Sequence, residues 1–205
     1  FSGVLIAHPS FPVKNVKELI ALALNRPRDI FHANAGFGSN LHMSTELFKY
    51  MAGQQHNKGK PLPMTAVQYK GGGPAMIALL SGEVQVTFTG MQSSTTFRKH
   101  GQMRAIAVSS KARSPAAPDI PTINESGVPG YIKGNWTGLW TQSAVPKHIV
   151  NAVYQAVAKV LKDPESVKRL AADGVEADGR TPEEFTRFVN AEIDEWIKLG
   201  EKIGI

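Results

Sequence analysis

The stretch Val67-Gln68-Tyr69-Lys70-Gly71-Gly72-Gly73-Pro74-Ala75 decides how this chain folds. The β-branched and aromatic residues of 65–69 are typical of a strand, and the apolar residues of 75–80 are typical of a helix. Pro74 suits the first turn of that helix. The three glycines therefore form a turn that ends on a helix N-terminus, where free backbone N–H groups and the helix dipole favour an anion.

The same arrangement occurs earlier in the chain. A strand-like run at 30–34 is followed by Ala35-Gly36-Phe37-Gly38-Ser39 and then by a helix from about Asn40. Two such turns in one small domain predict a cleft that holds a carboxylate or a phosphate. The alternative is that the glycines only permit tight strand-to-helix turns, and the sequence leaves both interpretations open.

Strands and helices alternate on either side of these turns. We expect strands at 2–7, 30–35, 65–69, 84–88 and 103–108, with helices after Asn15, from about 40 to 52, at 74–81 and at 92–100. This alternation predicts an α/β fold whose parallel or mixed sheet is covered on both faces. Ligands of such sheets bind beyond the carboxyl ends of the strands, where both glycine turns fall.

The second half of the chain has a different character. Four prolines break residues 109–134, which we interpret as a connection between lobes. A strand is expected at 134–141, followed by three helices, at 147–162, at 164–172 and from Pro182 onward. One strand and three helices provide too little sheet for an independent lobe. We therefore expect this part to join a sheet whose other strands lie before Phe1.

Composition excludes several classes of protein. The 205 residues carry a net charge of +6, but the basic residues are scattered and no nucleic-acid-binding signature is present. The sequence has no run of 18 apolar residues that would indicate a membrane-spanning helix. It contains no cysteine, which excludes disulfides and thiolate metal sites. Nucleic acid is therefore not an expected partner.

Side chains that carry chemistry are few. No nucleophile elbow, zinc-protease motif or phosphate-binding lysine motif occurs, and the histidines lack metal-ligand spacing, so we expect no catalytic residue, metal or cofactor. Asn34 ends a strand and Ser39 begins a helix, so both side chains can point at a ligand held by the turn. Ser39 is equally suited to be a plain N-cap. Thr89 ends the strand at 84–88, at the same sheet edge, and can donate to a ligand oxygen.

Motifs along almost the whole chain carry a family resemblance. They are Ile6-Ala7-His8-Pro9, Val16-Lys17-Glu18-Leu19-Ile20, 35–42, Glu46-Leu47-Phe48, 69–75, 80–86, 104–108, Arg113-Ser114-Pro115, 118–122, 127–131 and Thr181-Pro182-Glu183-Glu184-Phe185. In this order they resemble the periplasmic solute receptors of the tripartite tricarboxylate transporter system, the Bug family.

The resemblance implies a periplasmic-binding-protein-like α/β fold of two lobes that close around a small organic carboxylate. One complete, doubly wound lobe would bind ligand and span residues 9–110. Residues 1–8 would be a crossover strand from the other lobe, and residues 111–205 would return to that lobe as its C-terminal part. The remainder of the first lobe, including the family's first cleft loop, would precede Phe1.

The resemblance also implies which residues bind the ligand. Family members hold the ligand carboxylate largely through backbone amides and bridging waters. The matching positions are the turn of Gly36, Phe37, Gly38, Ser39 and Asn40, and also Gly71 and Gly72. Asn34 and Thr89 complete the expected set. Many relatives carry Asp-Asn where this chain has Thr89-Gly90, so no acid is offered to an ammonium group. A dicarboxylate or an aromatic acid is therefore expected in preference to an amino acid.

These observations predict an extracytoplasmic solute receptor, located in the periplasm, that serves membrane uptake or sensing. Its expected partners are membrane permease subunits or a sensor protein. A chain that lacks part of its sheet is also expected to form a homo-oligomer. The alternative is an α/β enzyme that acts on a phosphorylated or carboxylated metabolite, but the sequence shows no nucleophile–base pair or metal set for it.

Overall fold

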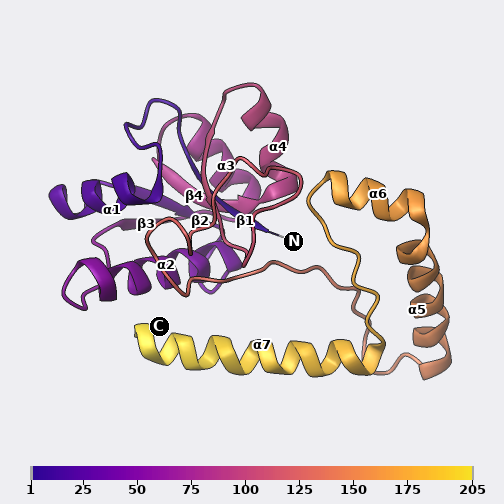
Figure 1. Cartoon of the computed structure of the whole chain (residues 1–205). Coiled ribbons are helices and arrows are strands. Elements are labelled where there is room, and N and C mark those ends of the chain that lie inside the picture. Colours follow the sequence, from indigo (N-terminus) through magenta and orange to yellow (C-terminus); the bar gives the residue numbers. More distant parts are fainter. Residues whose placement is uncertain (1, 205) are drawn as a thin grey trace. The chain divides into compact units, whose positions relative to one another are not determined.

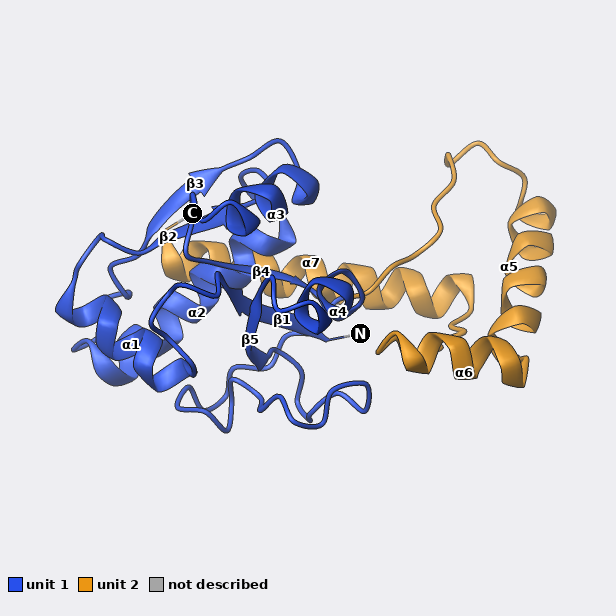
Figure 2. Cartoon of the chain, turned by 90° about the horizontal axis from the view of Figure 1, so that it is seen from above, with its two compact units in different colours: residues 1–135 blue, residues 136–205 orange. Residues whose placement is uncertain are grey.

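A computed structural model describes residues 2–204 of the chain. The chain divides into two compact units, Phe1–Asn135 and Trp136–Ile205 (Figure 2). The first unit contains, in chain order, β1 (Gly3–Ala7), α1 (Val16–Asn25), β2 (Phe31–Asn34), α2 (Asn40–His56), β3 (Thr65–Gln68), α3 (Gly72–Leu80), β4 (Val86–Gly90), α4 (Met91–Lys99) and β5 (Arg104–Val108). The second contains α5 (Lys147–Lys162), α6 (Pro164–Ala172) and α7 (Pro182–Ile203).

The first unit is built on a five-stranded mixed sheet with the strand order β3-β2-β4-β1-β5. Strand β2 pairs in parallel with β3 and with β4. Strand β1 lies between β4 and β5 and runs antiparallel to both. The expected α/β class is confirmed, and the antiparallel central strand makes the sheet mixed.

Helices cover both faces of this sheet (Figure 1). On one face, α3 and α4 pack over an apolar cluster that includes Val4, Ile6, Ala33, Leu79 and Met91. On the other face, Phe48 of α2 packs against Phe88 of β4 and Tyr131 in an aromatic cluster with ring centroids 6.2–6.5 Å apart. Burial on both faces explains why β1 is apolar throughout, without the alternation of a half-exposed strand.

Helix ends follow the capping signals of the sequence. The Asn15 side chain caps α1 by accepting from the Glu18 N–H, and Thr181 forms a complete capping box with Glu184 at the start of α7. Helix α2 extends to His56, beyond the expected end near Ala52. A Cβ at Gly53 would collide with the Lys60 carbonyl, so this glycine lets the following loop pack directly on the continuing helix.

The predicted connection at 109–134 is irregular and packs on the edge of the sheet. The Ile123 N–H donates to the Val108 carbonyl at 2.8 Å, and the Lys133 N–H donates to the Ser109 carbonyl at 2.8 Å. The Ser109 hydroxyl donates to the Lys133 carbonyl at 2.5 Å and accepts from the Gly3 N–H at 3.0 Å. The connection is therefore anchored to β1 and β5 along its length.

The prediction of a strand at 134–141 is wrong. Gly134 forms a single antiparallel bridge with Ser2, and no strand follows within residues 2–204. A strand needs a neighbouring backbone for its N–H and C=O groups, and the described chain offers none beyond this bridge. Trp136 and Trp140 instead pack against Phe185, with ring centroids 5.4 and 5.2 Å away.

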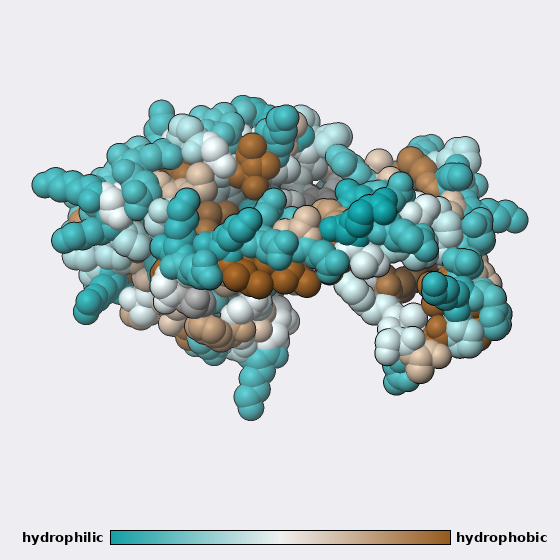
Figure 3. Space-filling view, turned by 90° about the horizontal axis from the view of Figure 1, so that it is seen from below, coloured by the Kyte–Doolittle hydropathy of each residue, from teal (hydrophilic) through white to brown (hydrophobic). Residues whose placement is uncertain are grey.

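The helices of the second unit leave much of their apolar surface exposed. Within the described residues, α5 buries only Ala158, α7 buries only Gly200, and α6 buries none. Exposed apolar side chains include Ile149, Val153, Val160, Val167, Ile193 and Ile197. Figure 3 shows hydrophobic side chains open to solvent among hydrophilic ones. All three helices are amphipathic, so they present faces suited to a further partner.

Candidate functional site

The carboxyl ends of three parallel strands meet at one edge of the sheet. Strands β2, β3 and β4 run in the same direction, and each leads within a few residues into a helix. The N-termini of α2, α3 and α4 therefore open at this edge. This is where an α/β sheet offers backbone N–H groups to a ligand.

The first glycine turn, residues 35–39, depends on two left-handed residues. Gly36 has φ 106° and Gly38 has φ 73°, conformations that glycine adopts readily and other residues adopt only with strain. Ser39 then caps α2, because its Oγ accepts from the His42 N–H at 3.3 Å. The plain N-cap role considered for Ser39 is thus present. The Asn40 Oδ1 accepts from the Ser44 hydroxyl at 3.3 Å.

Several N–H groups of this turn remain open to a ligand. Within residues 2–204, the backbone N–H groups of Asn40 and Leu41 have no hydrogen-bond partner. The Gly38 N–H donates to Nδ1 of His42 at 3.2 Å. The start of α2 therefore presents two free donors beside a third that an imidazole occupies.

The second glycine turn is equally open. Gly71 has φ 114° and caps α3 without a side-chain hydrogen bond. The helix begins at Gly72, two residues before the expected start at Pro74, because both intervening glycines take up helical geometry. A Cβ at Gly71, Gly72 or Gly73 would meet nothing within 4 Å. In the described chain, the Gly72 and Gly73 N–H groups have no hydrogen-bond partner, so both are available as donors.

The structure brings the two glycine turns side by side. The Tyr69 N–H donates to the Asn34 carbonyl at 2.9 Å, which joins the end of β3 to the end of β2. A Cβ at Gly36 would lie 3.9 Å from the Tyr69 carbonyl oxygen. The free donors of both turns therefore belong to one region of the sheet edge.

The side chains of Asn34 and Thr89, by contrast, leave the sheet on opposite faces. Ala33 pairs in parallel register with Thr87, and successive side chains of a strand alternate between faces. Asn34 therefore shares its face with Phe88, and Thr89 shares the other face with Thr87. Asn34 is fully buried and Thr89 is 9% exposed. A ligand that used both side chains would have to reach around the sheet edge.

Asn34 belongs to a buried polar group below the first turn. Its Oδ1 lies 3.2 Å from Nδ1 of His32, which is also fully buried. Neither Nδ2 of Asn34 nor Nε2 of His32 has a hydrogen-bond partner among the described residues. Burial, and secondarily the Lys49 ammonium, lowers the pKa of His32 to about 3, so the imidazole is neutral. Its 3.7 Å contact with the Glu46 carboxylate is therefore not an ion pair.

The carboxylates that contact residues around the two turns are already engaged. Glu46 forms an ion pair with Lys49 at 2.8 Å, and Glu83 accepts a hydrogen bond from the Tyr69 hydroxyl at 2.6 Å. The Lys49 ammonium neutralises Glu46, whereas Glu83 keeps its negative charge because the Tyr69 hydroxyl is an uncharged donor.

His42, a neighbour of the first turn, is a site residue that the sequence did not predict. His42 is 4% exposed, accepts from the Gly38 N–H and lies with its ring centroid 4.9 Å from that of Phe37. The available signal was its place three residues after the Ser39 cap, on the first turn of α2, where a side chain can reach back to the turn. Phe37 itself is 75% exposed.

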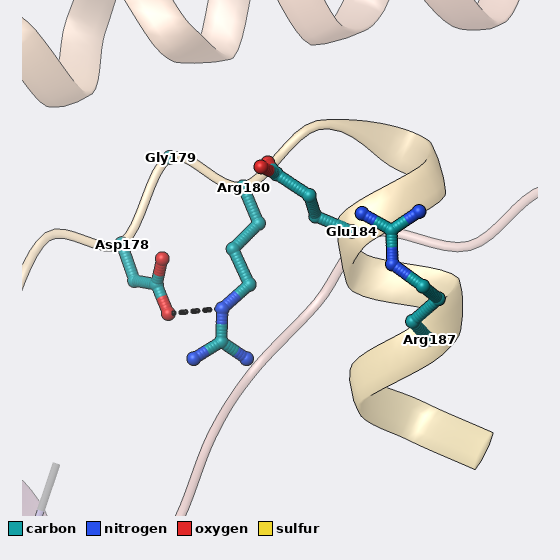
Figure 4. Close-up of a pocket in the computed structure, with 5 residues that line it drawn as sticks. All are labelled: Asp178, Gly179, Arg180, Glu184 and Arg187. Carbon is teal, nitrogen blue, oxygen red and sulfur yellow. Dashed lines mark ion pairs between the residues drawn. The ribbon is translucent and has the colours of Figure 1, made fainter. Parts of the chain in front are cut away.

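A separate pocket lies within the second unit, between the loop before α7 and the first turns of that helix (Figure 4). Arg180 pairs with Asp178 at 3.0 Å and lies 4.0 Å above the Phe188 ring centroid, while Glu184 completes the capping box. These groups stabilise the local turn, and we assign this pocket no ligand.

Two kinds of site are not found in the described part of the chain. Residues 2–204 contain no cluster of three or more side chains that could hold a metal ion. None of the helices there is both long and apolar enough to cross a membrane.

Comparison with protein families gives a match over the whole chain. A family model described as "Tripartite tricarboxylate transporter family receptor" matches residues 1–205. Among curated proteins, Protein BugT of Bordetella pertussis is 28% identical over 98% of this chain. The alignment covers 59% of BugT, so the chain spans well under two thirds of that relative's length.

Solved structures with the same fold cover the chain almost completely. The R. palustris protein Rpa4515, described with adipate, has a TM-score of 0.92 and 35% identity and covers 100% of this chain. The periplasmic binding protein BugD has a TM-score of 0.88 and 29% identity and also covers 100%. MatC of Rhodopseudomonas palustris, described with bound malate, has a TM-score of 0.84 and 29% identity and covers 97%. The chain covers 66% of each of these three proteins.

Proposed function

Because the chain belongs to the tripartite tricarboxylate transporter receptor family, we propose that it forms the ligand-binding part of a periplasmic receptor for a small organic carboxylate. The predicted Bug-family resemblance is confirmed by the match over residues 1–205. The predicted periplasmic-binding-protein fold is confirmed by the solved relatives, of which the chain covers 66%. Family membership supports a receptor in the periplasm, not the metabolic enzyme considered above.

One observation carries the proposal: two adjacent glycine turns present free N–H groups at the starts of α2 and α3. A carboxylate that accepts from these groups exchanges hydrogen bonds with water for charge-assisted bonds to the protein. The positive ends of the two helix dipoles add to the attraction. The ligand-binding residues expected from the sequence at 36–40, with Gly71 and Gly72, would act here mainly through their backbone.

We further infer the class of ligand and the partners of this receptor. Rpa4515 and MatC are described with dicarboxylates, adipate and malate, which supports a dicarboxylate for this chain. The segments 1–8 and 111–134, expected in the other lobe, contribute instead to this sheet and its edge. The first unit would therefore be the ligand lobe, and the second unit would belong to the other lobe. The liganded receptor would deliver its carboxylate to membrane permease subunits or present it to a sensor.

A thermal-shift screen of the full-length protein against small carboxylates tests the function. A ligand at 100 times its Kd stabilises the folded state by about 2.7 kcal/mol, which corresponds to a rise of roughly 5–10 °C in Tm. We expect such a shift with at least one dicarboxylate, and chromatography after prolonged incubation should recover that ligand unchanged. Conversion of the ligand to another compound would reject the receptor and favour the enzyme.

Selectivity between matched acids tests the ligand class. Succinate should bind at least tenfold more tightly than aspartate, and adipate more tightly than 2-aminoadipate. Thr89 and Gly90 offer no carboxylate to the added ammonium group, and an unpaired buried polar group costs about 1–3 kcal/mol. Isothermal titration calorimetry at constant pH measures each pair, and tighter binding of the amino acid would contradict the expectation.

A further inference from the structure

Phe37 is the most exposed large apolar side chain in the described part of the chain, at 75%. It stands at the tip of the first turn, between Gly36 and Gly38. A side chain so exposed contributes little to the hydrophobic stabilisation of the fold, because most of its surface stays in water. Its contribution should therefore lie in what it contacts outside the described structure.

The Phe37 ring has a fixed support. Its centroid lies 4.9 Å from that of His42, and the two planes are inclined by 38°. His42 is 4% exposed and is held through its Nδ1, which accepts from the Gly38 N–H at 3.2 Å. Its backbone N–H donates to the Ser39 Oγ. A buried imidazole, fixed by one hydrogen bond to its ring and one to its own backbone N–H, therefore supports the exposed aromatic ring.

This support places the ring beside the free donors of the turn. His42 is the third residue of α2, and Asn40 and Leu41 are the first two. A ring that packs on His42 therefore lies along the first helical turn, where the N–H groups of Asn40 and Leu41 are open. A carboxylate bound to those N–H groups would bring its carbon chain next to the Phe37 ring.

We propose that Phe37 is a specificity-determining residue: it forms an apolar wall that favours carboxylates with an extended methylene chain or an aromatic body over compact hydroxylated acids. The inference rests on the proposed receptor function and narrows its ligand class. His42 is the positioning residue of the wall, because it joins the ring to the backbone of the binding turn.

The affinities of dicarboxylates of increasing chain length test this role of Phe37 directly. Transfer of one methylene from water to an apolar surface raises affinity about fourfold. From succinate to adipate, two methylenes longer, the affinity of the unmodified protein should therefore rise roughly 16-fold. In Phe37→Ala this ratio should fall to about fourfold or less, while succinate affinity stays within about threefold. Phe37→Leu should give an intermediate ratio.

The experiment uses calorimetry on the full-length protein, with Ile77→Ala as the matched control. Ile77 lies on α3, is 68% exposed and has no place in the proposed wall, so its replacement should leave the ratio unchanged. An unchanged ratio in Phe37→Ala, or an equal loss for both acids, would overturn the wall while leaving the receptor function intact. Failure of the unmodified protein to bind any carboxylate would instead overturn the function and the wall with it.

Discussion

Replacing Gly38 by valine should lower the affinity of the full-length protein for adipate about a hundredfold. Gly38 has φ 73°, and an L-residue pays roughly 1–2 kcal/mol in this region, more when it is β-branched. A turn that relaxes out of this conformation also loses N–H groups aimed at the carboxylate, each worth about 1.5–3 kcal/mol as a charge-assisted bond. Calorimetry with adipate measures the loss.

Gly38→Asn is the matched control, because asparagine tolerates the left-handed conformation. A Cβ at this position would meet nothing within 4 Å, so the two variants differ mainly in backbone preference and hardly in crowding. The asparagine variant should retain most of the affinity, and both variants should keep the far-UV circular dichroism of the unmodified protein. If the valine variant binds adipate as tightly as the unmodified protein, the turn does not hold the carboxylate.

Residues 1–205 produced alone should self-associate. Val153 and Val160 on α5 are 48% and 56% exposed, and Ile193 and Ile197 on α7 are 50% and 56% exposed. Full burial of one such side chain is worth roughly 1.5–3 kcal/mol, so covering these faces with a second copy is strongly favourable. Light scattering combined with intact mass should give a dimer or a larger species.

A pair of charged substitutions tests the cause of this association. Ile193→Lys combined with Ile197→Lys should shift the chain toward monomer, because lysine side chains do not enter an apolar interface without cost. Ile77→Lys on α3, where the isoleucine is 68% exposed, is the control and should leave the assembly unchanged. A monodisperse, folded monomer of 22.2 kDa for the unmodified chain would refute the prediction.

Local signals predicted most of the fold. Capping residues and apolar periodicity identified the helices at 147–162 and from Pro182, and both begin where expected. The strand at 134–141 failed because its residues suit a strand but the described chain gives them no neighbour to pair with. Pairing is a non-local property, and a pattern of β-branched and aromatic residues cannot supply it.

The candidate site was predictable in its backbone and less so in its side chains. Glycines between strand and helix located both turns, because backbone positions with positive φ favour glycine and are therefore visible in the sequence. The burial of Asn34 and His32, and the separation of Asn34 from Thr89 by the sheet, depend on strand register. The role of His42 depends on a side chain reaching back along its own helix. Neither relation has a signature in a single sequence.

The position of β1 determines the order in which the first unit can be completed during synthesis. This strand lies at the centre of the sheet, yet its two neighbours are residues 86–90 and 104–108. At about 5–20 residues per second, β1 leaves the ribosome roughly 5–20 s before both neighbours exist. Its apolar segment Val4-Leu5-Ile6-Ala7 lacks both neighbours of this sheet during that interval and can pair wrongly with other nascent chains. The sheet of the first unit should therefore close only after β5 has been made, and folding yield should depend on how well β1 is shielded until then.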